Sequence, residues 1–196
     1  MRRLISSVIA VLVTLTAVAV LLFQHEGDQR PELQPVAVTH TIATEAPRTP
    51  DVRAVGQPRR VSIPAIGVDE RLHGVGLKAD GAMAMPDYGD AAWYDEGPRP
   101  GAAGPAVIVA HVRGPGGPDV FWDLAKLKAG DRITTTDTLG TTTFVVDRVE
   151  QVDKDDLPYD RIWSDSDAPL LRLITCAGTP GPNGFPDNTV VYAHTL

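Results

Sequence analysis

The sequence predicts a mainly β fold, a closed barrel or a sandwich, in the part of the chain that follows residue 58. Short runs rich in β-branched residues recur between turns that contain Gly and Pro. The run "TFVVDRVEQV" alternates between apolar and polar residues, as a half-buried strand does. Helical spacing is confined to one short segment. Many short strands with little helix are typical of closed barrels and sandwiches.

Six runs have the composition of strands, and each is bounded by turn residues. They cover residues 60–66, 106–112, 131–138, 141–153, 169–176 and 188–195. The segment 119–131, "DVFWDLAKLKAGD", is the best candidate for a helix, because apolar residues recur at helical spacing before a glycine. The run "DDLPYDRIWSDSD" is predicted to be a loop with one helical turn.

The N-terminus is predicted to be a membrane anchor. Residues 4–23 are uncharged and mostly apolar, which is long enough for a helix to cross the hydrocarbon core. Arginines precede this run and acidic residues follow it, so the N-terminus is expected to be cytoplasmic and the rest extracellular. A cleaved signal peptide is the alternative. The apolar run is long for one, and no clear cleavage site follows it.

Three segments are therefore expected along the chain. Residues 1–23 form a cytoplasmic stub and a transmembrane anchor. Residues 24–58 are rich in Pro and Thr and show no helical period, which is typical of an extended linker, although a propeptide or an added strand would also fit. Residues 59–196 form the folded domain.

Composition excludes some classes of function. The net charge is −7, whereas a nucleic-acid binder needs a basic surface, so no nucleic-acid partner is expected. No Cys/His cluster has the spacing of metal ligands. The acidic residues Asp153, Asp155 and Asp156 fit a plain acidic loop better than a calcium site. No metal and no cofactor is predicted.

Two residues suggest nucleophilic catalysis. Cys176 is the single cysteine of the chain, and it ends an apolar strand before a loop rich in Gly and Pro. His111 ends another apolar strand in the same way. A nearby imidazolium lowers the pKa of a thiol, and the thiolate can then attack an acyl carbon. The alternative is a cysteine that serves as a small buried apolar residue, together with a structural histidine.

Residues 61–196 resemble the sortases, the cysteine transpeptidases of Gram-positive cell surfaces. The resemblance lies in five segments that occur in the family's order. They are "VSIPAIGVDERLHGVGLKADGAMAMPD", "AAWYDEGPRPGAAGPAVIVAHV", "FWDLAKLKAGDRI", "LLRLITCAG" and "DNTVVYA". The "WY", "GP.PG" and "DN.VVYA" features resemble sortases of class F and the neighbouring class E.

This resemblance implies a closed barrel of about eight strands with one or two short helices, behind an N-terminal transmembrane helix. It implies that Cys176 is the nucleophile and His111 the general acid and base. The expected substrate is an LPxTG-like sorting signal of a secreted protein, cleaved between Thr and Gly through a thioester. The expected acceptor is an amine of a cell-wall precursor. Trp93, Tyr94 and Thr175 are candidates for substrate binding, although filling of the core explains the two aromatic residues at least as well.

The sequence departs from the family at one important position. Most sortases place an arginine on the closing strand, but no arginine follows Cys176 here. The corresponding position is Asn188, whose amide can donate a hydrogen bond to an oxyanion without adding charge. Arg113 and Arg99 are further candidates for the missing cation, and Arg113 also for substrate binding. Arg172 cannot easily replace the missing arginine, because it lies about 13 Å from Cys176 along the same strand.

The missing arginine keeps a second function open, which is a catalytically impaired sortase barrel that binds peptides or scaffolds a surface complex. The Cys176–His111 pair favours the enzyme, because a pure binding module has no need of an unpaired extracellular thiol. An NlpC-type cell-wall hydrolase fits poorly, because that family places its cysteine at the start of a helix and before the histidine.

Overall fold

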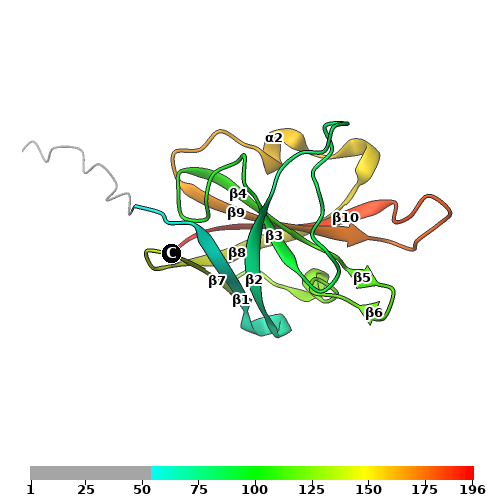
Figure 1. Cartoon of the computed structure of the whole chain (residues 1–196), viewed down its shortest axis with the longest axis horizontal. Coiled ribbons are helices and arrows are strands. Elements are labelled where there is room, and N and C mark those ends of the chain that lie inside the picture. Colours follow the sequence, from blue (N-terminus) through cyan, green and yellow to red (C-terminus); the bar gives the residue numbers. More distant parts are fainter. Residues whose placement is uncertain (1–53) are drawn as a thin grey trace, which may run out of the picture. The chain divides into compact units, whose positions relative to one another are not determined.

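The computed structural model describes residues 54–196, and these form a closed β-barrel (Figure 1). Eight strands close it in the order β1-β2-β3-β4-β9-β10-β8-β7. They are β1 (Pro58–Ile63), β2 (Val68–Val75), β3 (Ala91–Tyr94), β4 (Gly104–Ala110), β7 (Arg132–Asp137), β8 (Thr141–Asp153), β9 (Pro169–Ala177) and β10 (Asp187–Thr195). A small two-stranded sheet, β5 (Arg113–Gly114) and β6 (Gly117–Pro118), follows β4.

Helical structure in residues 54–196 is limited to single turns. The short helices are η1 (Pro64–Ile66), η2 (Leu124–Lys126), η3 (Lys154–Asp156) and α2 (Tyr159–Ile162). The turn predicted between the fourth and fifth strands is confirmed by η3 and α2. Within residues 54–196, no helix is long and apolar enough to cross a membrane. The predicted anchor and most of the predicted linker lie outside the described residues.

All six predicted strands are present, with small differences at their ends. The first one stops at Ile63, because Pro64 has no N–H for the ladder and starts the turn η1 instead. β2 and β3 were not recognised by composition. The sequence of β2, "VDERLHGV", carries too many charged residues, and β3 has only four residues.

The predicted helix over residues 119–131 is wrong, because only Leu124–Lys126 are helical and the turn is of the 3-10 type. The apolar residues Phe121, Leu124 and Leu127 are nevertheless buried in the barrel core. These three residues are spaced by three because they lie in consecutive turns, which cover one end of the barrel in place of the predicted helix. The backbone bonds Leu124 N–H to Phe121 O and Leu127 N–H to Leu124 O join residues three apart, as in such turns.

The direction of the strands determines which residues meet at that end. β4 and β9 are parallel neighbours, with Val109 opposite Ile174. β10 is antiparallel to both β9 and β8, with Asn188 opposite Cys176 on one side and Val152 on the other. The carboxyl ends of β4, β8 and β9 therefore lie together with the start of β10. The β9–β10 loop projects from this end (Figure 1).

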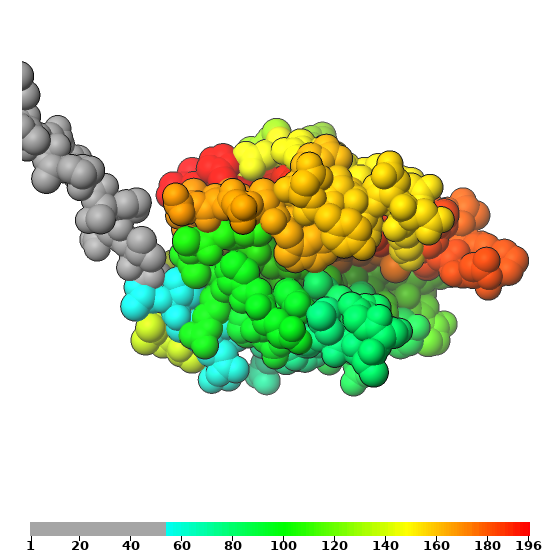
Figure 2. Space-filling view, turned by 90° about the horizontal axis from the view of Figure 1, so that it is seen from above, coloured from blue at the N-terminus to red at the C-terminus, as the bar shows by residue number. Residues whose placement is uncertain are grey.

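The described chain enters at the opposite end of the barrel. Gln57 is hydrogen-bonded to Thr138 in the β7–β8 turn, and the amide of Leu196 donates to Thr143 O at the start of β8. The first described residues and the C-terminus thus lie away from the β9–β10 loop, as Figure 1 shows. The space-filling view places the segment between β8 and β9 (yellow to orange) on the surface beside β9 (Figure 2).

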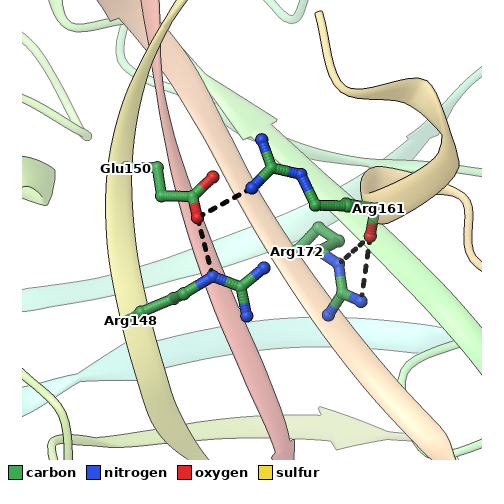
Figure 3. A network of polar contacts seen from close by, with 4 residues as sticks. All are labelled: Arg148, Glu150, Arg161 and Arg172. Carbon is green, nitrogen blue, oxygen red and sulfur yellow. Dashed lines mark hydrogen bonds and ion pairs between the residues drawn. The ribbon is translucent and has the colours of Figure 1, made fainter.

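This β8–β9 segment is fixed to the outside of the barrel by a group of side chains that we call the arginine network. Figure 3 shows its four charged members. Its members are Arg148, Glu150, Arg161, Arg172 and Tyr192. Glu150 Oε1 accepts hydrogen bonds from Arg148 Nε at 2.8 Å and from Arg161 Nη1 at 3.2 Å. Arg172 donates to the carbonyl of Arg161 at the end of α2 and lies over the ring of Tyr192.

Candidate active site

Cys176 lies in β9, one residue before the end of the strand, and its thiol is not in a disulfide. It is half-buried and lines a pocket of about 240 Å³ at the end of the barrel. The residues that line the pocket are Val112, Phe121, Trp122, Ala125, Gln151, Thr175, Cys176, Ala177, Gly178, Phe185 and Thr189. The sulfur is therefore accessible from a cavity large enough for part of a peptide.

Gly178 follows the last residue of β9, two positions after Cys176, and turns the chain away from the strand. Its φ angle is +85°, and a Cβ there would lie 2.9 Å from Pro186 Cγ. An L-residue would be strained at this φ and would press on the returning chain. The glycine lets the β9–β10 loop leave the strand sharply, so that the edge of the pocket beside Cys176 stays open.

Thr175 joins the strand of Cys176 to the strand of His111. Its side chain is buried, and the hydroxyl donates a 2.8 Å hydrogen bond to the carbonyl oxygen of Ala110. Thr175 also lines the pocket. Its clearest role is to hold the ends of β4 and β9 together at the point where the two reactive side chains emerge.

His111 follows β4 by one residue, and the register places it beside Cys176. Val109 and Ile174 are opposite one another, so two residues further along both strands the positions are 111 and 176. Opposed residues project from the same face of a sheet, and neighbouring strands lie about 4.8 Å apart. Backbone geometry therefore brings His111 and Cys176 to the same edge and the same outer face.

The imidazole itself is held by the β2–β3 connection. Nε2 of His111 lies 2.9 Å from the carbonyl oxygen of Pro86, so the nitrogen donates this bond. The ring of Tyr88 packs on the imidazole with a centroid distance of 4.5 Å. Gly89 N–H in turn donates to Asp119 Oδ1. Within residues 54–196, no hydrogen bond joins His111 to Cys176, and the bond to Pro86 engages only Nε2 of the ring.

Asn188 lies directly across the ladder from Cys176, in β10. Directly opposed residues of antiparallel strands have Cβ atoms about 5 Å apart and project from the same face. The amide of Asn188 is therefore carried on the same surface as the thiol.

Lys154 is a member of the site that sequence reasoning missed. Its Nζ lies 3.5 Å from Cys176 Sγ, within hydrogen-bond distance for sulfur. Lys154 begins η3, directly after β8, and its side chain crosses β10 to reach β9. Only the register of three strands reveals this contact, because 22 residues separate the two positions. Together, Cys176, His111, Asn188 and Lys154 are called the thiol cluster below.

The aromatic pair expected to bind substrate is elsewhere. Trp93 is 6% exposed and belongs to the main core, where its indole N–H donates to Pro98 O. Tyr94 packs on the outer face against Val107 and Val109, and its hydroxyl contacts Glu96. Burial, followed by the nearby carboxylates of Glu96 and Asp95, raises the pKa of Tyr94. Neither side chain lines the pocket of Cys176. Burial of Trp93 fits the alternative of core filling, and substrate binding by Tyr94 stays a prediction.

The arginine candidates differ in position. Arg113 lies with its guanidinium 5.9 Å from the ring centroid of Trp122, which lines the pocket, so Arg113 is at the pocket rim. Arg99 donates instead to Val55 O, close to the first described residues. Arg172 is buried in the arginine network. Arg99 therefore does not fit the role of the missing cation, because its guanidinium binds Val55 O at the opposite end of the barrel from Cys176.

Comparison with solved structures supports the fold. Sortase A from Corynebacterium diphtheriae superposes with a TM-score of 0.56 at 20% identity, over 73% of this chain and 62% of that one. The pilus-related sortase C of Group B Streptococcus gives 0.56 at 20% identity, over 74% and 70%. Sortase C1 from Streptococcus agalactiae gives 0.57 at 23% identity, over 70% and 66%. The chain thus spans less than two thirds of the length of the first of these sortases and of the third.

No curated protein matches the sequence. The sortase-domain model matches residues 61–196, which is well over half of the chain and includes every member of the thiol cluster. Together with the closed barrel and the placement of the thiol at its end, this match establishes the family. The chain belongs to the sortases, a family of cysteine transpeptidases.

Proposed function

We propose that this protein is a membrane-anchored sortase that cleaves an LPxTG-like sorting signal between Thr and Gly. It retains the acyl part as a thioester on Cys176 and transfers it to an amine of a cell-wall precursor. The observation that carries the proposal is the accessible thiol of Cys176 in a pocket, one strand away from His111. The family membership gives the reaction class, and the residues of the thiol cluster give the roles.

The reaction begins with transfer of the thiol proton of Cys176 to His111. The thiolate attacks the threonine carbonyl carbon, and the electron pair of the C=O bond moves to oxygen. The amide of Asn188 is placed to donate to this oxyanion. The C=O bond re-forms, the C–N bond breaks, and the departing nitrogen takes the proton from the His111 imidazolium.

Transfer then runs through the same groups in reverse. Neutral His111 removes a proton from the acceptor amine as the amine nitrogen attacks the thioester carbon. The C–S bond breaks and Cys176 leaves as a thiolate beside the imidazolium. Cys176 cannot form a disulfide within this sequence, because the sequence has a single cysteine.

Placement in the membrane and the subclass belong to the same proposal. The apolar run of residues 4–23 anchors the chain, with the N-terminus in the cytoplasm and the barrel outside. Residues 24–58 act as an extended linker. The motifs "WY", "GP.PG" and "DN.VVYA" support the proposal that the enzyme is a sortase of class F or the neighbouring class E. Fractionation of cells that express the tagged chain tests the anchor, and a barrel recovered in the medium would contradict it.

The experiment that tests the activity uses the full chain, purified in detergent. It is incubated with a panel of LPxTG-like peptides and glycinamide as the acceptor. Mass spectrometry is expected to find an acyl adduct on Cys176 and a peptide whose C-terminal glycine segment has been exchanged for glycinamide. The matched control is Cys176→Ala, which should give neither product because it has no nucleophile.

Binding without chemistry would favour the second function. If the wild-type chain binds a panel peptide but forms no adduct, the barrel is a peptide-binding module. Cleavage by Cys176→Ala at the wild-type rate would show that the nucleophile is a different residue.

A further inference from the structure

Lys154 is the cationic side chain that contacts the reactive sulfur. The distance from its Nζ to Cys176 Sγ is 3.5 Å, and both residues are half-buried. Lysine carries three N–H donors and a compact positive charge, so a contact with a thiolate is both a hydrogen bond and a charge interaction. A cation in this position favours the ionised form of a thiol.

The backbone of Lys154 is fixed where this contact requires it. Its N–H donates to Pro186 O at 3.1 Å, which extends the pairing of β8 and β10 by one more step. Asp153 accepts a hydrogen bond from the amide of Asp155 and so caps the turn η3 that Lys154 begins. The Cα of Lys154 is therefore held by the same sheet that carries Cys176.

The carboxylates close to Lys154 in the sequence form no ion pair with its ammonium group within residues 54–196. Asp153, Asp155 and Asp156 surround Lys154 in the sequence. Nevertheless, among the ion pairs within residues 54–196 none includes Lys154. Asp153 instead serves its local turn. The ammonium group of Lys154 contacts the sulfur of Cys176 instead.

The other cations near this end of the barrel are occupied differently. Arg113 stacks over Trp122 at 5.9 Å, and Arg172 is bonded to the carbonyl of Arg161. His111 donates to Pro86. A protein without an arginine after Cys176 thus still has a fixed positive charge at the thiol, supplied from the end of β8.

We propose that Lys154 is a catalytic residue that stabilises the Cys176 thiolate and takes the electrostatic place of the missing arginine. The inference depends on the proposed function for its role in turnover, but the state of the sulfur can be measured without any substrate. Lys154 takes no part in proton transfer. The thiol proton still goes to His111, and the ammonium stays beside the sulfur while the C–S bond forms and breaks.

The test is the pH dependence of alkylation of the full chain by iodoacetamide in detergent. Since the chain has one cysteine, the rate reports on Cys176 alone. Lys154→Ala is expected to move the midpoint of the profile upward by about one pH unit, and to slow alkylation at pH 7 by roughly tenfold. Lys154→Arg keeps the charge and should lie close to wild type.

Lys128→Ala is the matched control, because Lys128 is an exposed lysine of a neighbouring turn that does not line the pocket. It should leave the profile unchanged. Circular dichroism of each variant establishes that the barrel is folded. A folded Lys154→Ala variant with the wild-type midpoint would overturn the proposal.

A second measurement separates this inference from the proposed function. With a peptide that the wild type cleaves, Lys154→Ala should reduce kcat/KM by roughly 100-fold, and Lys154→Arg should recover most of it. A shifted alkylation profile together with a wild-type chain that cleaves no peptide would uphold the charge at the sulfur and contradict the transpeptidase. An unchanged alkylation profile for Lys154→Ala, together with normal peptide cleavage by the wild type, would uphold the transpeptidase and contradict the role of Lys154.

Discussion

The arginine network and the thiol cluster lie on the same outer face of the barrel, yet they differ in how many partners surround their charged groups. Arg172 and Cys176 are four residues apart in β9 and project to the same side. Arg172 is 5% exposed and donates to two backbone carbonyls, while Glu150 accepts from two further arginines. The thiol instead faces an open pocket and a single ammonium.

The pKa values of Glu150 and Tyr192 show the effect of these partners in the network. Burial alone raises the pKa of Glu150, but the hydrogen bond and charge of Arg148 and the charge of Arg161 outweigh burial, so the pKa lies below its ordinary value. Burial, followed by the charge of Glu150, raises the pKa of Tyr192. Each group is held in one protonation state near neutral pH, which suits a structural role.

The thiol cluster has the opposite property. A thiol and an imidazole each change protonation state during acyl transfer, so a site that held them permanently in one state would not work. On this face of the barrel, the charged groups of the arginine network are surrounded by partners and stabilise the fold. The groups of the thiol cluster lie at a pocket and remain available for chemistry. Variants of the two groups should therefore separate stability from activity.

The largest effect is expected for His111→Ala. Without the imidazole no group receives the thiol proton or protonates the leaving nitrogen, so peptide cleavage should fall by roughly 10³-fold or more. The urea midpoint should stay near that of wild type, because His111 lies outside the core. Peptide cleavage and urea unfolding are measured on the same preparation. A loss of less than about tenfold would show that His111 is structural.

Asn188→Ala should have the next largest effect, because a donor to the oxyanion acts only in the transition state. Acylation should slow by about 100-fold, while the pH profile of iodoacetamide alkylation stays unchanged. This separates Asn188 from Lys154, whose removal is expected to change both. Rapid-quench measurement of adduct formation gives the acylation rate. An unchanged rate would mean that another donor holds the oxyanion.

Thr175→Val removes the hydrogen bond that joins the ends of β4 and β9. The carbonyl of Ala110 loses its hydroxyl partner, so the free energy of unfolding should decrease by about 1–2 kcal/mol. Cleavage should also slow, because the same bond sets the spacing between His111 and Cys176. Thr175→Ser keeps the hydroxyl and serves as the control. If Thr175→Val and Thr175→Ser cleave peptide equally fast, the bond does not position the site.

The smallest effect is expected for Glu150→Gln, in the arginine network. The free energy of unfolding should fall by about 1 kcal/mol at pH 7, with no change in the alkylation profile of Cys176. Because the folded-state pKa of Glu150 is lowered, its contribution is complete above the unfolded pKa and disappears as the pH falls through the folded pKa. Urea unfolding at pH 7 and below pH ~4 should therefore show the two proteins converging. A constant difference would contradict the assigned charge interaction.

Prediction from sequence worked where local pattern and tertiary structure agree. β8 was predicted with its observed bounds, because its alternation persists over 13 residues. Cys176 and His111 were predicted to lie at strand ends, and β4 and β9 do end next to them, whereas their catalytic roles stay a prediction. Prediction failed where one pattern fits two structures. The apolar spacing of residues 119–131 suits either a helix or a series of turns, and an aromatic residue such as Trp93 fits a groove as well as a core.

The sequence by itself determined the β-rich class and the single thiol, and it singled out the cysteine and histidine that we propose carry the chemistry, because composition and periodicity are local properties of the chain. Tertiary structure alone decided which cation meets the sulfur, that Pro86 and Tyr88 hold the imidazole, and that Trp93 is buried. These depend on the register of strands that are distant in sequence. A lysine 22 residues from a cysteine becomes its neighbour only when β10 pairs with both β8 and β9.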